Sequence, residues 1–157
     1  MKTDYEHVKE FTEGTGTVCP DKPVAMSKEQ VMFLSKMILD EVMEFTATVC
    51  GPEESKNTLK EFIDNSKDLP RGDYTQGSVE QISEQVDALV DIYYYSLNAA
   101  TKVGQDMSAV FKIVHKANMA KRVPETGKFI KREDGKILKP VGWKPPNIVK
   151  EIEKQMK

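Results

Sequence analysis

Residues 38–45, ILDEVMEF, and residues 83–95, SEQVDALVDIYYY, decide the fold of this chain. Each stretch has apolar residues at the spacing of an amphipathic helix, with carboxylates set among them. These acids are Asp40, Glu41 and Glu44 in the first stretch and Glu84, Asp87 and Asp91 in the second. Because an uncompensated carboxylate in an apolar core costs several kcal/mol, two such clusters predict a counter-charge, most simply a divalent cation.

The length and composition of the chain predict one soluble globular domain. The sequence has 157 residues, of which 39% are hydrophobic and 31% are charged, and this length is enough for a sizeable core. A formal net charge of −2 argues against a nucleic-acid or membrane surface. The N-terminal MKTDYEHVKEF lacks both a secretory apolar core and an arginine-rich transit character, so a cytoplasmic location is expected. Cys19 and Cys50 stand alone and are expected to be reduced thiols.

Capping and breaking signals predict an all-α fold, a bundle of four to five helices. The expected helices are residues 27–50, 54–67, 79–103, 107–122 and a short one at 147–155. Ser27 and Gln30 fit a capping box, and Gly51-Pro52 ends the first helix. The LPRGD sequence at 69–73 breaks the second helix, and Asp106 is the expected N-cap of the fourth.

The two ends of the chain differ in character from the helices. Residues 1–26 contain two Gly, two Pro and a Thr-rich patch, which predicts a partly ordered N-terminal arm before a domain at 27–157. Beyond Pro124, the turn signals Thr126-Gly127 and Asp134-Gly135 lie near apolar pairs. This C-terminal segment is therefore expected to be a small hairpin or an irregular excursion.

The helical periodicity of about 100° per residue places the carboxylates on defined faces. Glu41 falls within the apolar stripe of its helix, and Glu44 projects from the same side. In the second stretch three acids share one face: Glu84, Asp87 and Asp91. The pattern leaves open whether this face is solvated, although Ala88, Tyr94 and Tyr95 lie on it and favour partial burial.

Two helices that each present acids at an i, i+3 spacing can enclose a hard cation between them. Oxygen-only ligation favours Mg²⁺, with Mn²⁺ as the alternative, over zinc. Because Mg²⁺ keeps water and substrate phosphate in its coordination shell, a phosphate-bearing substrate is implied. A di-iron site with Glu-x-x-His is disfavoured, since neither His7 nor His115 follows a Glu by three residues.

Glu41-x-x-Glu44 followed by Glu84-x-x-Asp87 resembles the ExxE…ExxD signature of the all-alpha NTP pyrophosphatases, a MazG-like superfamily. Downstream, HKANMAK at 115–121, DGKILKP at 134–140 and GWKPP at 142–146 resemble segments of its phosphoribosyl-ATP-pyrophosphohydrolase-like members. The resemblance covers about residues 27–148 and implies a helical bundle that assembles as a homodimer or homotetramer. The gap between the acid pairs, with its insertion at 54–77, is longer than in compact members and leaves the nucleobase open.

The resemblance also implies an activity and a set of site residues. The expected reaction is Mg²⁺-dependent hydrolysis of a nucleoside triphosphate to a monophosphate and pyrophosphate, in a nucleotide-pool or house-cleaning role. A phosphoribosyl-ATP-like nucleotide is the other substrate considered. The expected metal ligands are Glu41, Glu44, Glu84, Asp87 and Asp91, with Glu41 and Glu44 as the catalytic acids and Glu44 as general base. The residues expected to contact substrate are Asn118, Lys121, His115 and Tyr95.

Each of these assignments has a structural alternative. Lys121 lies near the C-terminal end of a helix, where a cation is favourable to the helix dipole without any ligand. A core or interface histidine explains His115 better than a catalytic role does, and stacking of Tyr95 on a base stays open. The alternative function is a non-catalytic helical interaction or regulatory module that keeps the bundle without turnover.

Overall fold

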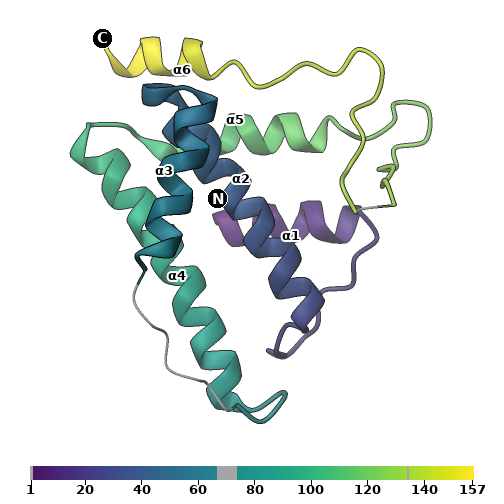
Figure 1. The fold of residues 1–157 in the computed structure, drawn as a ribbon. Coiled ribbons are helices and arrows are strands. Elements are labelled where there is room, and N and C mark those ends of the chain that lie inside the picture. The colour runs from purple at the N-terminus through teal and green to yellow at the C-terminus, as the bar shows by residue number, and fades with distance from the viewer. Residues whose placement is uncertain (1, 67–73, 134) are drawn as a thin grey trace. The chain divides into compact units, whose positions relative to one another are not determined.

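The computed structural model describes residues 2–66, 74–133 and 135–157, and its regular elements in these ranges are helices apart from one β-bridge (Figure 1). The helices are α1 (Asp4–Gly14), α2 (Lys28–Cys50), α3 (Pro52–Asp64), α4 (Val79–Lys102), α5 (Met107–Met119) and α6 (Ile148–Gln155). The predicted all-α class is therefore confirmed. None of the described helices is long and apolar enough to cross a membrane.

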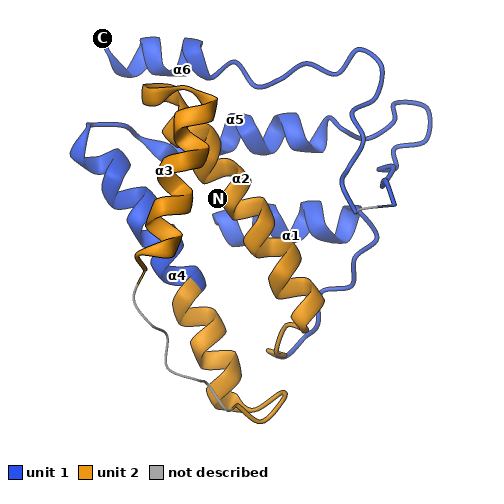
Figure 2. Cartoon of the chain, viewed as in Figure 1, with its two compact units in different colours: residues 1–22, 89–157 blue, residues 23–88 orange. Residues whose placement is uncertain are grey.

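The chain divides into two compact units (Figure 2). Unit 1 consists of residues 1–22 and 89–157, and unit 2 consists of residues 23–88. Helix α4 contributes its first ten residues, 79–88, to unit 2 and the rest to unit 1. The first acid-bearing stretch thus lies in unit 2 and the second is divided between the units after Ala88, whereas the HKANMAK segment belongs to unit 1.

In unit 2, α3 folds back on α2 and the two helices pack together (Figure 1). The predicted capping box at the start of α2 is present, with both Ser27 and Gln30 bonded to each other's backbone. Gly51 turns the chain with a φ of 82°, and Pro52 occupies the first turn of α3, where its missing N–H is not needed. Ser55 is fully buried, and its hydroxyl donates to the carbonyl of Met43 at 2.9 Å, which fixes α3 against α2.

The first turns of α4 are anchored within unit 2 by one amide side chain. The Gln85 carboxamide oxygen accepts from the Met26 backbone N–H at 2.8 Å, and its amide nitrogen donates to the Met26 carbonyl at 3.2 Å. This paired bond holds the segment before α2 against α4. The predicted LPRGD breaker at 69–73 lies outside the described residues.

In unit 1, α5 contacts both α1 and α6. Asp106 caps α5 as predicted, accepting from the backbone of Ser108 and Ala109, but the helix ends at Met119, three residues before the expected end. Trp143 donates its indole N–H to the Ala117 carbonyl at 2.8 Å and so ties the C-terminal tail to α5. The Gln155 carboxamide oxygen accepts from the Asp106 backbone N–H, and the Gln155 amide nitrogen donates to the Asp106 carbonyl. These two bonds attach α6 to the start of α5.

Helix α1 lies within the segment that was expected to be a partly ordered arm. Its N-terminus has a complete capping box formed by Thr3 and Glu6, a signal that was present in the sequence and overlooked. Phe11 from α1 meets Phe129 edge to face, with ring centroids 5.1 Å apart. The N-terminal helix is therefore packed against the remainder of unit 1.

The C-terminal segment after α5 contains the small hairpin that was expected. An antiparallel bridge joins Lys131 and Ile137, and the Leu138 N–H donates to the Ile130 carbonyl at 2.8 Å. The predicted turn residue Asp134 is outside the described residues, while Gly135 beside it has a φ of 83°, a conformation that glycine adopts without strain.

Candidate functional site

The five carboxylates predicted to bind metal are all exposed in the single chain. Glu41 and Glu44 lie three residues apart on α2, and Glu84 and Asp87 do the same on α4. These four residues belong to unit 2, and Asp91 follows one turn later on the part of α4 in unit 1. The burial from which the sequence argument started is therefore not present in one chain.

The apolar side chains that flank these acids are exposed as well. On α2 they include Met32, Phe33, Leu39, Val42, Phe45 and Val49, and on α4 they include Val86, Leu89, Val90, Ile92 and the three tyrosines 93–95. Phe45, next to Glu44, has 74% of its surface exposed. Large apolar surfaces of this kind mark contacts with another molecule. The acids would be buried among these apolar side chains only if another molecule covered the two helix faces.

One chain does not gather the predicted carboxylates into a metal site. Over the described ranges, the group of three or more candidate ligands whose atoms approach within 4.8 Å of one another is His7, Glu10 and His115. None of the acids on α2 and α4 belongs to it. Their assignment as metal ligands stays a prediction.

The predicted substrate residues of the HKANMAK segment lie at the end of α5. Asn118 and Lys121 are both half-buried. The Lys121 ammonium lies 5.7 Å from the centroid of the Trp143 ring, and that of Lys139 lies 4.6 Å from it. Burial lowers the pKa of Lys121, and the charges of Lys139 and Lys136 lower it further. This concentration of positive charge around Trp143 is suited to an anion.

Tyr95, the other predicted substrate contact, has 68% of its surface exposed on α4. Its ring is accessible for stacking on a base or for contact with another chain. Its part in substrate binding stays a prediction.

His115 is half-buried on α5 and its ring lies against α1. Its centroid is 4.5 Å from that of His7 and 6.2 Å from that of Phe111, to which it is nearly parallel at 5°. Burial lowers the pKa of His115, and the nearby charge of His7 adds to this effect. Its immediate neighbours are thus a second imidazole and the Glu10 carboxylate.

The sequence reasoning missed His7 and Glu10. Their i, i+3 spacing on one helix was visible, but nothing in the sequence indicated that His115, more than a hundred positions away, would join them. Glu10 is also paired with the Lys2 ammonium at 2.8 Å, and this pairing lowers the pKa of Glu10.

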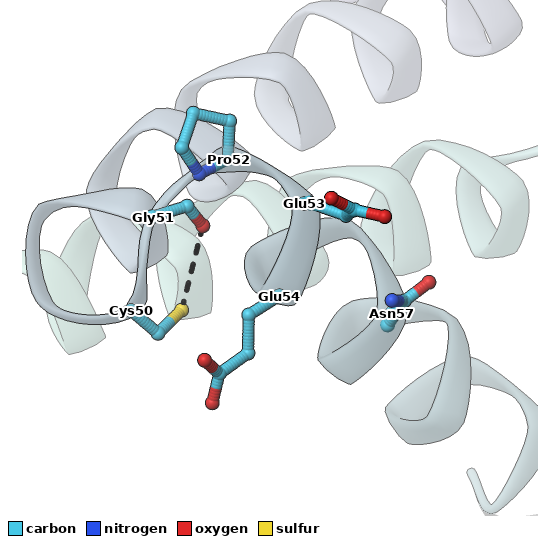
Figure 3. A pocket seen from close by; sticks show the side chains of 6 residues that line it. All are labelled: Cys50, Gly51, Pro52, Glu53, Glu54 and Asn57. Atoms are coloured by element: carbon cyan, nitrogen blue, oxygen red, sulfur yellow. Dashed lines mark hydrogen bonds between the residues drawn. The ribbon is translucent and has the colours of Figure 1, made fainter.

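A pocket of about 430 Å³ lies at the junction of α2 and α3 and contains none of the predicted residues (Figure 3). It is lined by Cys50, Gly51, Pro52, Glu53, Glu54 and Asn57. The Cys50 thiol is 3.7 Å from the Gly51 carbonyl, and Glu53 and Glu54 begin α3 with two negative charges. The lining of this pocket offers no cationic side chain for direct contact with a phosphate.

The helical architecture and the ExxE and ExxD pairs define the class of the all-alpha, MazG-like NTP pyrophosphatases. Within that class, residues 8–118 match the family described as phosphoribosyl-ATP pyrophosphohydrolase. Because this match spans well over half of the chain, the protein belongs to that family.

A solved structure supports the same relationship. The chain is similar to the crystal structure of a "putative NTP pyrophosphohydrolase" from Exiguobacterium sp. 255-15, with a TM-score of 0.76 and 27% sequence identity. The similarity covers 99% of this chain and 96% of the other. No curated protein matches this chain significantly.

Proposed function

We propose that this protein hydrolyses a nucleoside triphosphate between its α and β phosphates, releasing a nucleoside monophosphate and pyrophosphate. The family match at 8–118 carries the proposal, because that range contains both acid pairs as well as His115 and Asn118. The likeness to an NTP pyrophosphohydrolase over nearly the whole of both chains supports the same class of reaction.

The donor set on α2 and α4 suits a hard divalent cation. Glu41, Glu44, Glu84 and Asp87 offer only carboxylate oxygens, and Asp91 adds a further one, which favours Mg²⁺ or Mn²⁺ over softer ions. When bound, Mg²⁺ supplies neutralisation of phosphate charge and a lower pKa for attacking water. Glu41 and Glu44 are proposed as the acids closest to the chemistry.

The side chains of the protein supply the remaining steps. Glu44 accepts the proton of the attacking water as general base. Lys121 binds a phosphate oxygen as a point charge, which relieves the repulsion it experiences from Lys136 and Lys139. Asn118 offers a donor and an acceptor for the nucleotide.

We propose that the active form is a homodimer or homotetramer in which the exposed faces of α2 and α4 are covered by other copies. The apolar side chains beside the acids support this assembly, since their removal from water provides the driving force. Association also lowers the dielectric around the carboxylates, which strengthens their need for a cation.

The base of the nucleotide follows from no single residue in the chain. Base selection rests on pocket shape and a few placed hydrogen bonds, and part of the 54–77 insertion lies outside the described residues. Canonical nucleotides and a phosphoribosyl-ATP-like nucleotide are both candidates.

The test is pyrophosphate release from a panel of ribo- and deoxyribonucleoside triphosphates and phosphoribosyl-ATP. Turnover of at least one member with Mg²⁺, abolished by a chelator and restored by added Mg²⁺, is the expected result. Absence of turnover on every member, by a folded protein, would favour the non-catalytic helical module instead.

A further inference from the structure

A second constellation of ligand-type side chains lies in unit 1, separate in sequence from the acids of α2 and α4. His7 and Glu10 project from successive turns of α1, and His115 reaches them from α5. One ligand atom from each lies within 4.8 Å of the other two. All three side chains are half-buried.

We propose that His7, Glu10 and His115 form a metal site for a zinc-class divalent ion, distinct from the magnesium site. Two imidazoles and a carboxylate are a ligand set that binds zinc and related transition ions. Mg²⁺ is not the expected occupant, because it prefers oxygen ligands. Three protein ligands leave one tetrahedral position for water.

The geometry requires only a small contraction to accept the ion. Zinc bonds of about 2.0–2.2 Å place tetrahedral ligand atoms about 3.3–3.6 Å apart, compared with the separations of up to 4.8 Å found here. Side-chain rotations on α1 and α5 can supply this difference. Because α1 and α5 are already in contact, no rearrangement of the helices is needed.

A ring nitrogen of His7 that lacks a hydrogen-bond partner also indicates a ligand. Nδ1 of His7 is buried and has no hydrogen-bond partner among the described residues. A buried polar atom without a partner is costly, and the two imidazole rings lie only 4.5 Å apart by their centroids. An ion bound through Nδ1 of His7 would satisfy an atom that the described residues leave unpaired.

Lys2 is the competitor for the ion. Its ammonium lies 2.8 Å from a Glu10 oxygen, so a cation already compensates this carboxylate, and a metal ion would displace it. Because the Lys2 side chain is largely exposed, with 55% of its surface accessible, its release into water is easy. Removing the ammonium is therefore expected to strengthen metal binding.

The site would fasten the N-terminal helix to α5. An ion that binds only the folded state stabilises it by RT ln(1 + c/Kd), where c is the free ion concentration, so zinc would hold α1 in place next to the segment with Asn118 and Lys121. His7 precedes residue 8, where the family match begins, whereas Glu10 and His115 lie within the matched range.

The experiment is a calorimetric titration of the full chain with Zn²⁺ in excess Mg²⁺, which occupies oxygen-only sites. We expect one zinc per chain. Loss of an outer-shell partner already weakens metal binding about 10- to 100-fold, so His7→Gln and Glu10→Gln are each expected to weaken it at least about tenfold. Glu13→Gln on the same helix is the matched control, with affinity unchanged, and Lys2→Gln is expected to raise affinity.

Two further readouts keep the outcome interpretable. Zinc should raise the thermal midpoint of the wild type and not that of His7→Gln, and circular dichroism establishes that each variant is folded. A cobalt-loaded sample should lack thiolate charge-transfer absorption, since Cys19 and Cys50 are not in the proposed set. The proposal is overturned if no zinc binds, if His7→Gln binds it as tightly as the wild type, or if cobalt reports thiolate ligands.

Discussion

The acid-bearing helices α2 and α4 differ from the helix pair α1 and α5 in whether one chain alone brings their candidate metal ligands together. On α2 and α4 the proposed ligand residues are conspicuous in the sequence, yet in the single chain they are exposed and do not converge on one point. On α1 and α5 the ligand residues were inconspicuous, yet they converge within 4.8 Å.

This contrast has a physical cause in the surroundings of each set. The acids on α2 and α4 are flanked by exposed apolar side chains such as Phe45 and Tyr95, which a second copy can cover. The histidines sit between two helices of the same unit that already pack together. Under these proposals, the site on α2 and α4 requires assembly, whereas the site on α1 and α5 forms within one folded chain.

The largest effect is expected from removing one metal-binding charge from each acid pair. Glu41→Gln and Asp87→Asn keep the side-chain volume and delete a ligand charge, so pyrophosphate release should fall at least about 100-fold. Glu61→Gln on α3, also an exposed helical glutamate, is the matched control and should retain activity. Full activity in both variants would show that Glu41 and Asp87 are not required metal ligands.

The dependence on assembly is tested at Phe45, which is 74% exposed beside Glu44. Phe45→Lys places a charge where a partner is expected to pack, so the mass measured by light scattering should shift toward the monomer and activity should fall with it. Lys60→Gln, on the exposed surface of α3, should change neither. A wild type that is monomeric and fully active would show that the acids need no second copy.

A smaller effect is expected at Trp143, which fixes the C-terminal tail to α5. Its indole donates to the Ala117 carbonyl, and its ring is half-buried. Trp143→Ala should reduce the free energy of unfolding by about 2 kcal/mol, below the range for a fully buried ring. Trp143→Phe, which loses the hydrogen bond and part of the ring, should reduce it by about 1 kcal/mol. Equal losses in urea unfolding would assign the whole effect to the hydrogen bond.

The smallest effect concerns pH. The pKa of His115 is lowered in the folded state from its ordinary 6.5, first by burial and then by His7. The unfolded chain therefore binds more protons between the two pKa values, so stability falls as pH drops below about 6.5 and levels off below the folded pKa. His115→Gln should flatten this dependence in urea unfolding between pH 8 and about pH 5. An unchanged pH dependence in the variant would show that groups other than His115 cause it.

Local signals in the sequence predicted most of the helices. The caps at Ser27 and Asp106 act as expected, because capping depends on residues within one turn. The same rule would have found α1 from Thr3 and Glu6, but the Gly, Pro and Thr content of residues 1–26 was given more weight. Helix ends without a strong stop, such as that of α5, were misplaced by a few residues.

Tertiary convergence was less accessible to sequence reasoning. Periodicity places Glu41 with Glu44 and Glu84 with Asp87 on helix faces, but it does not specify which faces meet or whether they meet within one chain. Periodicity also gives no indication that His7 and His115 lie close together in the folded chain. The family resemblance identified the class of protein because it relates motifs that lie far apart in the sequence, which helical periodicity does not do.

The central claim, hydrolysis between the α and β phosphates, is tested most directly by ³¹P NMR of the reaction products. With a substrate identified from the nucleotide panel and Mg²⁺ present, the account predicts resonances of a nucleoside monophosphate and pyrophosphate in equal amounts. Nucleoside diphosphate with inorganic phosphate would contradict it, because those products require cleavage at the terminal phosphate.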